Sequence, residues 1–554
     1  GCEREWVGSL RTAEVPGSAT ATLAQVMDDK VKLRAWQVHG LPADLVSTEN
    51  GIILANSRRW ALAIDPQGQA NKWIRNMEGD NGVEICKPSD KDFLRTLENA
   101  VRFGKPVIME NVASTLDPSL EPVLLKQTFK QGGNEVMKIG DNTIPYHADF
   151  KFYLTTKLPN PHYAPEVAVK VTLLNFTITQ EGLEDQLLGI TVAKERPDLE
   201  ETKNNLIIQS AKMAAQLKDI ESTILKLLSE STGNILDDEG LINTLAQSKV
   251  TSNEIAVKAE EARATELTID QTRNEYRPVA FRGALLFFCV ADMGQVDPMY
   301  QYSMPWFTSL FMKAIDESEK SDEIAERLVN LNDYFSYSLY LNICRSLFEA
   351  HKLLFSFMVC IKVMQGDNLI DPDEWRFFLS GTSGSRIEMQ NPAPEWLTSA
   401  VWGALCSLDK LPAFGGVAGS VAANLPGWRD YFDSNEPHNH QLPGEWDAKL
   451  NMLQKLCVLR CVRGDKVVPG MQNFVSANIG ERFIEPPAFE IGKCFKDASN
   501  VMPIVFVLTS GADPFEALMK FAEEMKFGKK LVPVSLGQGQ GPIAEKQMNQ
   551  AMER

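Results

Sequence analysis

The chain has 554 residues, of which 44% are hydrophobic, so it can bury sizeable cores in about three to five domains, and wholesale disorder is excluded. A formal net charge of −17 argues against nucleic acid as a partner, and no apolar run approaches the roughly 18–20 residues that span a bilayer. Nine scattered cysteines without a Cys-x-x-Cys motif indicate reduced thiols in a cytosolic interior.

Residues 1–195 alternate between strand-like and helix-like segments, which predicts an α/β domain built on a parallel sheet. The segment 89–104 predicts an amphipathic helix between two of the strands. Its apolar face carries Phe93, Leu94, Leu97 and Val101. The expected strands are GIILANS (51–57), WALAID (60–65), KPVIMENV (105–112) and DFKFYLTTKL (149–158).

The stretch AIDPQGQANKWI (63–74) has the strand, tight loop and helix start of a phosphate-binding loop. A working loop, G-x-x-x-x-G-K-[ST], holds phosphates with backbone N–H groups and the Lys, and binds Mg²⁺ with the Ser/Thr hydroxyl. Only Lys72 matches this pattern, because Pro66 and Asn71 replace the two glycines and Trp73 replaces the hydroxyl residue. Gly68, the one glycine of the stretch, lies between these positions.

The strand 105–112, which would supply the metal-binding and water-polarising carboxylates, also departs from the active pattern. An active module ends this strand in Asp-Glu, one residue for Mg²⁺ and one to polarise water, whereas this chain has Glu110 and Asn111. Asn111 cannot act as a carboxylate base. We therefore expect no catalytic residue, no metal and no bound cofactor here, only remnants of a nucleotide site. An active P-loop ATPase module with divergent loops is the alternative.

Residues 199–275 lack Pro and carry apolar residues at intervals of three and four, which predicts an antiparallel coiled-coil hairpin about 45 Å long. A turn signal at 229–240 separates the two arms. A two-helix piece of an ordinary bundle is the alternative. Small seam residues leave room for another helix to dock. The seam residues of the two arms are Leu206, Ser210, Met213, Leu217, Ile220, Ile224 and Leu227, then Leu241, Leu245, Ser248, Ser252, Ile255, Ala259, Ala262 and Ile269.

Residues 276–500 are predicted to be mainly helical, with loops at 381–396 and 434–446. GALLFFCV (283–290) fits either a buried strand or a turn of a core helix. His438 and His440 lie in the second loop, in a Pro- and Asn-rich context that does not favour a metal site.

A second strand–loop–helix unit is predicted at 501–525, and a further strand, Gly-rich loop and helix at 530–552. The loop of the 501–525 unit has Gly511 but no Lys at the distance that a phosphate-binding loop requires, and the negative charge of Asp513 would repel a phosphate. The chain begins at Gly1 without Met or a secretory signal and finishes abruptly at Arg554. We expect both ends to be cuts inside a larger protein.

Long stretches of the chain closely resemble a dynein heavy chain, from its fifth AAA+ module into the start of its sixth. They include GLPADLVSTENGIILANSRRWALAIDPQGQANKWI, FKFYLTTKLPNPHYAPEVAVKVTLLNFTIT, YRPVAFRGALLFF and VLTSGADPFEALMKFA. The strings LKQTFKQGG and ITVAKERPDLEE are most similar to axonemal heavy chains of the inner-arm type. The resemblance implies P-loop NTPase-like AAA+ modules with a parallel sheet, helical small subdomains and an antiparallel coiled-coil hairpin insertion.

The resemblance also implies a division of the chain into four parts. These are the large subdomain of the fifth module (1–195), the coiled-coil buttress or strut (196–277), the helical small subdomain (278–365) and the truncated sixth module (366–554). In the family the first four modules of a six-module ring handle ATP and Mg²⁺, and the last two are structural. After TTKLPNPHYAPE no Arg stands where a finger toward a neighbouring module is expected, so none is named.

The implied function is part of an ATP-driven, minus-end-directed microtubule motor of cilia and flagella. The implied partners are the neighbouring AAA+ modules, the stalk, microtubules through the missing stalk tip, and dynein intermediate and light chains. The implied location is the cytoplasm, within the axonemal cytoskeleton. The segment itself is expected to lack hydrolytic activity and to relay motion from the ring to the stalk. A passive coiled-coil scaffold is a third hypothesis, which explains the hairpin but not the two loop units.

Overall fold

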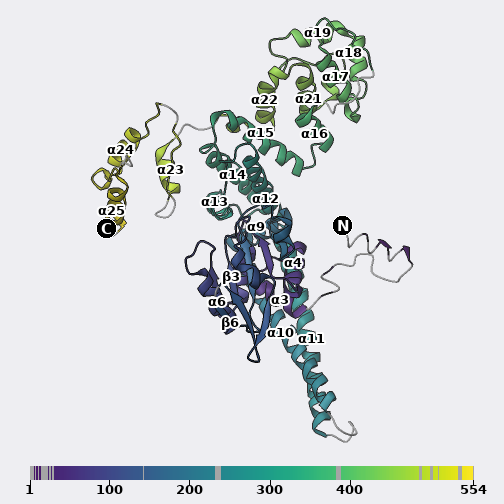
Figure 1. The fold of residues 1–554 in the computed structure, drawn as a ribbon. Helices are drawn as coiled ribbons and strands as arrows, with labels where there is room; N and C mark the ends of the chain where they lie inside the picture. Colours follow the sequence, from purple (N-terminus) through teal and green to yellow (C-terminus); the bar gives the residue numbers. More distant parts are fainter. Residues whose placement is uncertain are drawn as a thin grey trace. The chain divides into compact units, whose positions relative to one another are not determined.

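The computed structural model describes residues 30–140, 142–230, 239–381, 389–485, 490–498, 503–508, 511–534 and 539–552, with a few single positions before residue 30. The chain divides into two units, Gly1–Ile484 and Glu485–Arg554 (Figure 1). The first unit holds an α/β body, a pair of long helices and a large helical body. The predicted module boundary at 366 stays a prediction.

A five-stranded parallel sheet forms the centre of the α/β body, in the order β2-β3-β7-β1-β8. The predicted parallel sheet and three of the predicted strands are confirmed, and β2 and β8 are strands that the sequence analysis missed. The carboxyl ends of parallel strands meet at one edge, so the loops after β1 and β3 lie near each other. The strands are β1 Ala61–Ile64, β2 Glu84–Cys86, β3 Val107–Met109, β7 Phe152–Thr156 and β8 Thr172–Asn175.

The prediction of a strand at 51–57 is wrong, because residues 51–56 form the second half of helix α4, Leu45–Asn56, and Ser57 is its C-cap residue. The side chain of Asp44 caps this helix by accepting a hydrogen bond from the backbone N–H of Ser47 at 2.9 Å. A short apolar run cannot by itself distinguish a strand from a buried helix turn, and here the upstream cap decides.

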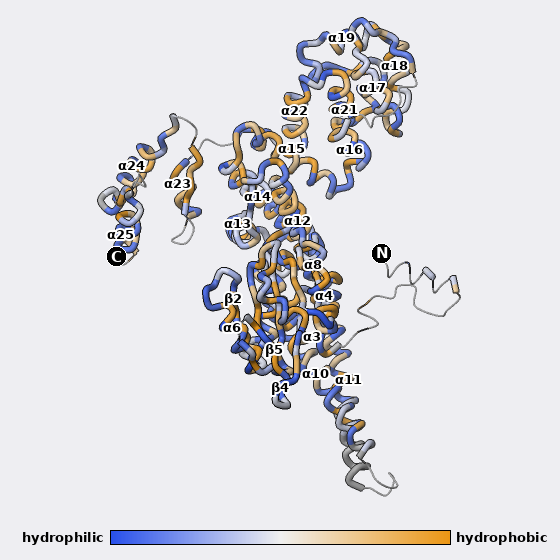
Figure 2. Tube along the Cα trace, viewed as in Figure 1, coloured by the Kyte–Doolittle hydropathy of each residue, from blue (hydrophilic) through white to orange (hydrophobic). Residues whose placement is uncertain are grey.

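Residues of the strands alternate between two hydrophobic cores, one on each face of the sheet. Leu62, Met109 and Leu154 face the core that also receives helix α6, Phe93–Phe103, whose apolar face lies as predicted. Ala63 and Ile108 face the other core. Figure 2 shows apolar residues concentrated in this central sheet. The second core receives helices α3, Lys30–Val38, and α5, Gln69–Met77.

A small antiparallel sheet, β4-β5-β6, covers the α6 side of the body and contributes Met137, Ile139 and Ile144 to its core. Its strands are β4 Thr128–Gln131, β5 Asn134–Ile139 and β6 Asn142–Pro145. The short helices of the body are η1 Gly79–Asn81, η2 Pro118–Leu120, α7 Glu121–Leu124 and α8 Pro165–Ala168.

Two long helices, α10 (Pro197–Glu230) and α11 (Glu239–Asn274), lie side by side and project from the body as an antiparallel pair (Figure 1). At 1.5 Å per residue, the 34 residues of α10 span roughly 50 Å. The predicted turn lies largely outside the described residues, as do the side chains of Leu227, Leu241 and Leu245.

Burial along the two helices follows the predicted seam. On α10 the partly buried positions include Leu206, Ser210, Met213, Leu217, Ile220 and Ile224. On α11 they are Ser248, Ser252, Ala259 and Ala262, with Ile255 and Ile269 fully buried. Helix α3 packs on α10. The docking of another helix at the small seam residues stays a prediction. The supercoil of a true coiled coil stays a prediction.

Helix α9, Gln180–Glu195, leads from the α/β body into α10, and the chain returns from α11 into a helical body with one continuous core. Residues 283–290 belong to helix α12, which resolves the open choice in favour of a core helix. The helices are α12 Arg277–Asp292, η4 Met293–Gln295, α13 Met304–Glu317, α14 Ile324–Cys344, α15 Glu349–Gly366, α16 Pro372–Ser380, α17 Ser399–Leu408, η5 Pro412–Phe414, α18 Val417–Ala423, α19 Leu425–Asp433, α20 Trp446–Lys449, α21 Met452–Val462, η6 Gly464–Lys466, α22 Val467–Ile479 and η7 Glu481–Phe483.

The second unit contains the predicted helices but not the predicted strands. Its helices are α23 Ile491–Asp497, α24 Phe515–Glu524, η8 Gly528–Lys530 and α25 Gly541–Met552. Within the described parts of 501–508 and 530–534 no strand forms, and Val505 and Val507 are 78% and 73% exposed. A strand is held by hydrogen bonds to its neighbours, and the described residues of this unit supply no partner strand.

Candidate functional site

The loop between β1 and α5 is closed by a carboxylate of its own. Asp65 follows β1 directly and is 2% exposed. Its Oδ1 accepts a hydrogen bond from the backbone N–H of Gln69 at 2.8 Å, and its Oδ2 accepts one from that of Asn71 at 2.9 Å. These N–H groups, at the N-terminus of α5, are the kind that hold a phosphate in a working loop. The side chain of Asp65 therefore occupies the place that an anionic ligand would need.

The local sequence explains this geometry. Asp65-Pro66-Gln67-Gly68 has Asp, Pro and Gly where a type I turn prefers them, and the N–H of Gly68 donates to the carbonyl of Asp65 at 3.3 Å. Gly68 has φ +80°, which glycine adopts without strain, and it is the N-cap residue of α5. Burial raises the pKa of Asp65, and hydrogen bonds from the backbone N–H groups of Asn71 and Gln69 oppose the rise only in part.

Helix α5 is bound to Glu110, the residue that directly follows β3. Asn71 Nδ2 donates to Glu110 Oε1 at 2.9 Å, and the guanidinium of Arg75 forms an ion pair with the same carboxylate. Burial alone would raise the pKa of Glu110, but hydrogen bonds from Arg75 and Asn71 outweigh it and hold the pKa below its ordinary value. Asn111, at φ +57°, is exposed, and its side chain is an amide that cannot supply a carboxylate. The carboxylate available for Mg²⁺ is thus already satisfied by α5.

Trp73 lies at the position of the Mg²⁺-binding hydroxyl and is fully buried in the hydrophobic core. Its ring meets that of Trp36, on α3, edge to face with a centroid distance of 5.8 Å. On another side it meets Phe176 at 6.0 Å. Trp73 thus packs against α3, the helix that also packs on α10.

Polar side chains also close the outer side of the loop. Gln67 Oε1 accepts a hydrogen bond from the backbone N–H of Ile178 at 3.3 Å, and Gln69 Oε1 accepts one from Gln186 Nε2, on α9, at 2.9 Å. Lys72, the surviving residue of the pattern, is exposed. Asp65 and Glu110 make their contacts within the protein, where ATP with Mg²⁺ would need free N–H groups and a free carboxylate, so the residues of this loop do not fit that ligand.

The second loop, in the other unit, is open. Gly511 has φ +88°, and both Gly511 and Asp513 are exposed. Asp513 Oδ1 accepts a hydrogen bond from the backbone N–H of Phe515, the first residue of α24, at 2.9 Å. Its carboxylate caps the helix, as that of Asp65 does, but in contact with solvent.

Other candidate chemistry is sparse in the described part of the chain. No group of three or more His, Cys, Asp or Glu side chains there could hold a metal ion, and His440 Nε2 instead lies 3.3 Å from Asp430 Oδ2. The eight described cysteines are free, and burial raises the pKa of the Cys461 thiol to about 12. Among the described helices, none is both long and apolar enough to cross a membrane.

Charged side chains tie the two long helices together at their root. Lys203 Nζ, on α10, donates to Asp270 Oδ1, on α11, at 2.6 Å, and the guanidinium of Arg273 lies 3.1 Å from the Glu200 carboxylate. Arg273 is 8% exposed. These pairs join both arms at the end nearest the body.

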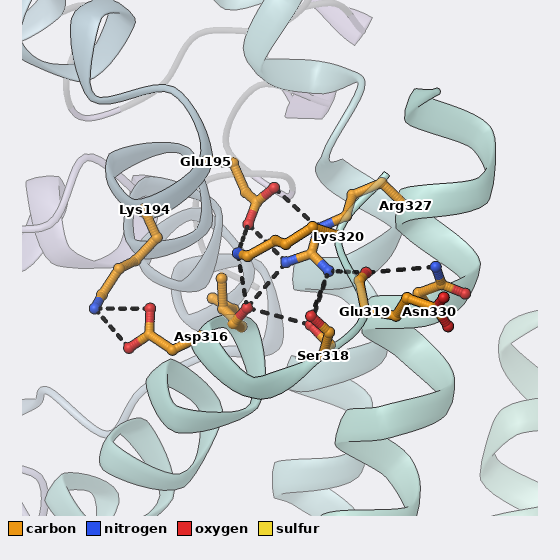
Figure 3. A network of polar contacts seen from close by, with 9 residues as sticks. Lys194, Glu195, Asp316, Ser318, Glu319, Lys320, Arg327 and Asn330 are labelled. Carbon is orange, nitrogen blue, oxygen red and sulfur yellow. Dashed lines mark hydrogen bonds and ion pairs between the residues drawn. The ribbon is translucent and has the colours of Figure 1, made fainter. Parts of the chain in front are cut away.

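A second cluster joins the C-terminal end of α9, just before α10, to helices α13 and α14 of the helical body (Figure 3). Arg327, on α14, is 2% exposed and holds the carboxylate of Glu195 with two hydrogen bonds, of 3.0 and 2.8 Å. Lys320 Nζ reaches Glu195 Oε1 at 3.1 Å. Burial alone would raise the pKa of Glu195, but hydrogen bonds from Arg327 and Lys320 outweigh it and lower the pKa.

The sequence analysis missed both anchoring carboxylates. For Asp65 a signal existed, because Asp-Pro-x-Gly is a turn signature, but the loop was compared with the phosphate-binding pattern from Pro66 onward. For Glu195 no local signal exists, since its partner Arg327 is 132 residues away in the chain.

Comparisons with known proteins agree with this architecture. A family model described as the ATP-binding dynein motor region matches residues 34–255, and one described as the dynein heavy chain region D6 P-loop domain matches residues 499–554. The chain is 54% identical over 549 residues to dynein axonemal heavy chain 1 of Homo sapiens, covering 99% of this chain and 13% of that protein.

Two further relatives extend the comparison. Dynein axonemal heavy chain 3 of Mus musculus is 49% identical over 552 residues, covering 100% of this chain and 14% of that protein. Dynein axonemal heavy chain 2 of Mus musculus is 43% identical over 551 residues, covering 99% of this chain and 12% of that protein. The chain thus spans about one eighth of the length of these relatives. Its end-to-end similarity to them, together with the two motor-region matches, shows that the chain belongs to the dynein heavy-chain family and is a segment of its motor.

Proposed function

We propose that this segment is a structural, force-relaying part of an ATP-driven, minus-end-directed microtubule motor, and that it binds no nucleotide itself. The carboxylate of Asp65 on the N–H groups of Gln69 and Asn71 carries the proposal. Each hydrogen bond to a charged group contributes roughly 1.5–3 kcal/mol, so a phosphate would have to displace contacts as strong as those it could form. ATP and Mg²⁺ are then used by other modules of the full motor.

The helix pair gives the segment a route for relayed motion. It projects from the body on charged, partly buried contacts at its root, and its seam carries several small residues, such as Ser210, Ser252 and Ala259. A slim seam permits a partner helix to approach closely and to slide. The 196–277 segment is assigned as the buttress, which leans on the stalk and changes the register of the stalk helices, and hence microtubule affinity.

The assignment extends to partners and location. The names of the relatives support a place in the axoneme of a cilium or flagellum, within the cytoplasmic cytoskeleton. The partners are the neighbouring AAA+ modules and stalk of the same heavy chain, microtubules through the stalk tip, and dynein intermediate and light chains. The inner-arm type and the four-part division of the chain belong to the same proposal.

Photocrosslinking tests the absence of a nucleotide. The full heavy chain is irradiated with an azido-ATP and Mg²⁺, and the labelled peptides are mapped. We expect label at other modules and none on residues 42–77, with no change after Lys72→Ala. Saturable labelling of this loop that Lys72→Ala abolishes would instead establish the alternative, an active ATPase module.

A break in the helix seam tests the relay. Leu217→Pro removes a backbone hydrogen bond from the interior of α10, at a cost of about 3 kcal/mol or more. In the full heavy chain we expect ATPase activity to persist while microtubule affinity no longer changes with the nucleotide. Leu217→Ser and Leu225→Ser form a matched pair, because Leu217 lies on the seam and Leu225 is 68% exposed. Only the first should weaken the coupling, and intact coupling in Leu217→Pro would refute the relay.

A further inference from the structure

The junction between α9 and α10 is a single non-helical residue. α9 ends at Glu195 and α10 begins at Pro197, while Arg196 between them has φ −139° and ψ 68°, outside the helical region. Pro197 has no N–H with which to continue the ladder of hydrogen bonds from α9. A joint of one residue fixes the direction of the following helix only if the side chains beside it are held.

Arg327 holds this joint from the helical body. Two of its donors, Nε and Nη2, bind the two carboxylate oxygens of Glu195 side by side. Its Nη2 also donates to the carbonyl of Ile315 at 2.9 Å, and its Nη1 to the carbonyl of Ser318 at 3.2 Å and to that of Glu319. These carbonyls lie at or just beyond the C-terminal end of α13. The guanidinium therefore links Glu195 to the end of α13 as well as to α14.

Neighbouring ion pairs do not share these properties. Lys194, one residue before Glu195, pairs with Asp316 at 2.8 Å, but the two side chains are 40% and 54% exposed. Arg196, one residue after it, pairs with Asp198 at 3.0 Å, and these are 45% and 62% exposed. Exposed pairs are screened by solvent and restrain little. Figure 3 shows the Lys194–Asp316 pair, which joins α9 to α13, beside the Arg327 network.

We propose that Glu195 and Arg327 form a positioning pair that fixes the angle at which α10 leaves the helical body. The planar fork of Arg327 sets both distance and direction, which a point charge would not. Through this pair, the helices α9, α13 and α14 and the hairpin of α10 and α11 move together. The inference rests on the proposed relay function, because an angle held in this way matters only if the hairpin transmits motion.

The first measurement is the spread of hairpin orientations in the full heavy chain. Spin labels are placed by genetically encoded, non-cysteine chemistry at Val257, on α11 and 60% exposed, and at Val329, on α14 and 65% exposed. Pulsed dipolar spectroscopy gives the distribution of distances between them. We expect a broader distribution for Arg327→Lys and for Glu195→Gln. Lys194→Gln, the matched control, should leave it unchanged. Unchanged distributions in both pair variants would overturn the proposal.

A double variant that exchanges the two charges distinguishes the hydrogen bonds of Arg327 to the α13 carbonyls from simple attraction between opposite charges. Glu195→Arg combined with Arg327→Glu restores opposite charges but places an acceptor against the carbonyls at the end of α13. We expect no rescue of the narrow distribution. A full rescue would overturn the anchoring role of Arg327. Hydrogen exchange of the α14 amides verifies that each variant is folded.

The second measurement is coupling, the ratio of microtubule affinities with and without ATP. Arg327→Lys should reduce this ratio by roughly fivefold or more, and Lys194→Gln should not. If Arg327→Lys leaves the ratio unchanged while Leu217→Pro abolishes it, the positioning pair is refuted and the relay stands. If Leu217→Pro also leaves the ratio unchanged, the relay itself fails.

Discussion

Two segments of this chain, 63–74 and 501–525, are predicted from the sequence as strand–loop–helix units but differ in the structure. In both, an Asp carboxylate accepts a hydrogen bond from a backbone N–H at the start of the helix. In the first, the apolar run is a central strand and Asp65 is buried. In the second, the described residues 503–508 form no strand, and Asp513 is exposed.

This difference teaches what a local pattern can and cannot specify. Cap and turn residues act within a few positions, so a helix follows the loop in both segments, as the sequence predicts. A parallel strand depends on neighbours far along the chain, and β1 has them in β7 and β8. The same local sequence pattern therefore places a buried carboxylate in the loop of one unit and an exposed carboxylate in that of the other.

Trp73→Ala should break the comparison most strongly. Removing a fully buried indole is expected to lower the free energy of opening of the α5 amides by about 3–5 kcal/mol, because the cavity cannot fully collapse. Native-state hydrogen exchange of the full chain measures this. Phe515→Ala, in the second unit and 47% exposed before the change, should cost less than about 1 kcal/mol in α24. Equal losses would contradict the contrast.

Glu110→Gln tests the contacts that Glu110 makes with Asn71 and Arg75 of helix α5. At pH 7 we expect a loss of about 1.5–3 kcal/mol in the opening free energy of α5, since the charged acceptor of Arg75 and Asn71 is removed. The pKa of Glu110 is lowered in the folded chain, so its contribution is present above the ordinary value of 4.5 and is lost as the pH falls through the lowered pKa.

The pH series provides the control for this prediction. Hydrogen exchange of the unchanged chain and of Glu110→Gln, measured from pH 7 downward, should show their stabilities converging only below pH 4.5. A difference that stays constant across this range would mean that the Glu110 charge contributes nothing.

Asp65→Asn and Asp513→Asn compare the two loops directly. Each replaces one carboxylate oxygen by an amide NH₂ at a residue that accepts a hydrogen bond from a backbone N–H of the following helix. In Asp65→Asn an amide NH₂ replaces one acceptor oxygen and faces a backbone N–H, so we expect a loss of about 1–2 kcal/mol in α5. Asp513→Asn should stay within about 0.5 kcal/mol in α24, since solvent replaces the lost contact. Hydrogen exchange of the two helices compares them, and a larger effect at Asp513 would reverse the interpretation.

The smallest loss of local stability is expected from substitutions in the two apolar runs, β3 and residues 503–508. Ile108→Val removes one methylene group from a fully buried strand residue and should cost about 0.5–1.5 kcal/mol of local stability. Val505→Ala, at a position 78% exposed, should change stability by less than about 0.5 kcal/mol. Differential hydrogen exchange of β3 and of residues 503–508 measures both. A cost at Val505 as large as that at Ile108 would show that the second run is packed.

Much of the architecture could be predicted from the sequence, and the errors have physical causes. The heptad intervals placed Leu217 and Ile255 on the seam because helix periodicity is a local property. The run 51–57 was misassigned, since its apolar residues fit either a strand or a helix and the cap at Asp44 was not weighed. The degenerate loop was identified by its residues, but its closure depends on contacts such as Asn71 with Glu110, which only the folded sheet brings together.

The buried indole of Trp73 also limits which substitutions in this loop the fold can tolerate. A return to a metal-binding hydroxyl at this position would remove the ring that seats Trp36 before any ligand could bind in compensation. Three further replacements, at Asp65, Pro66 and Asn71, would have to accompany it. A single replacement at Trp73, Asp65 or Asn71 would therefore remove contacts that stabilise the folded chain, and would not by itself create a phosphate or Mg²⁺ site.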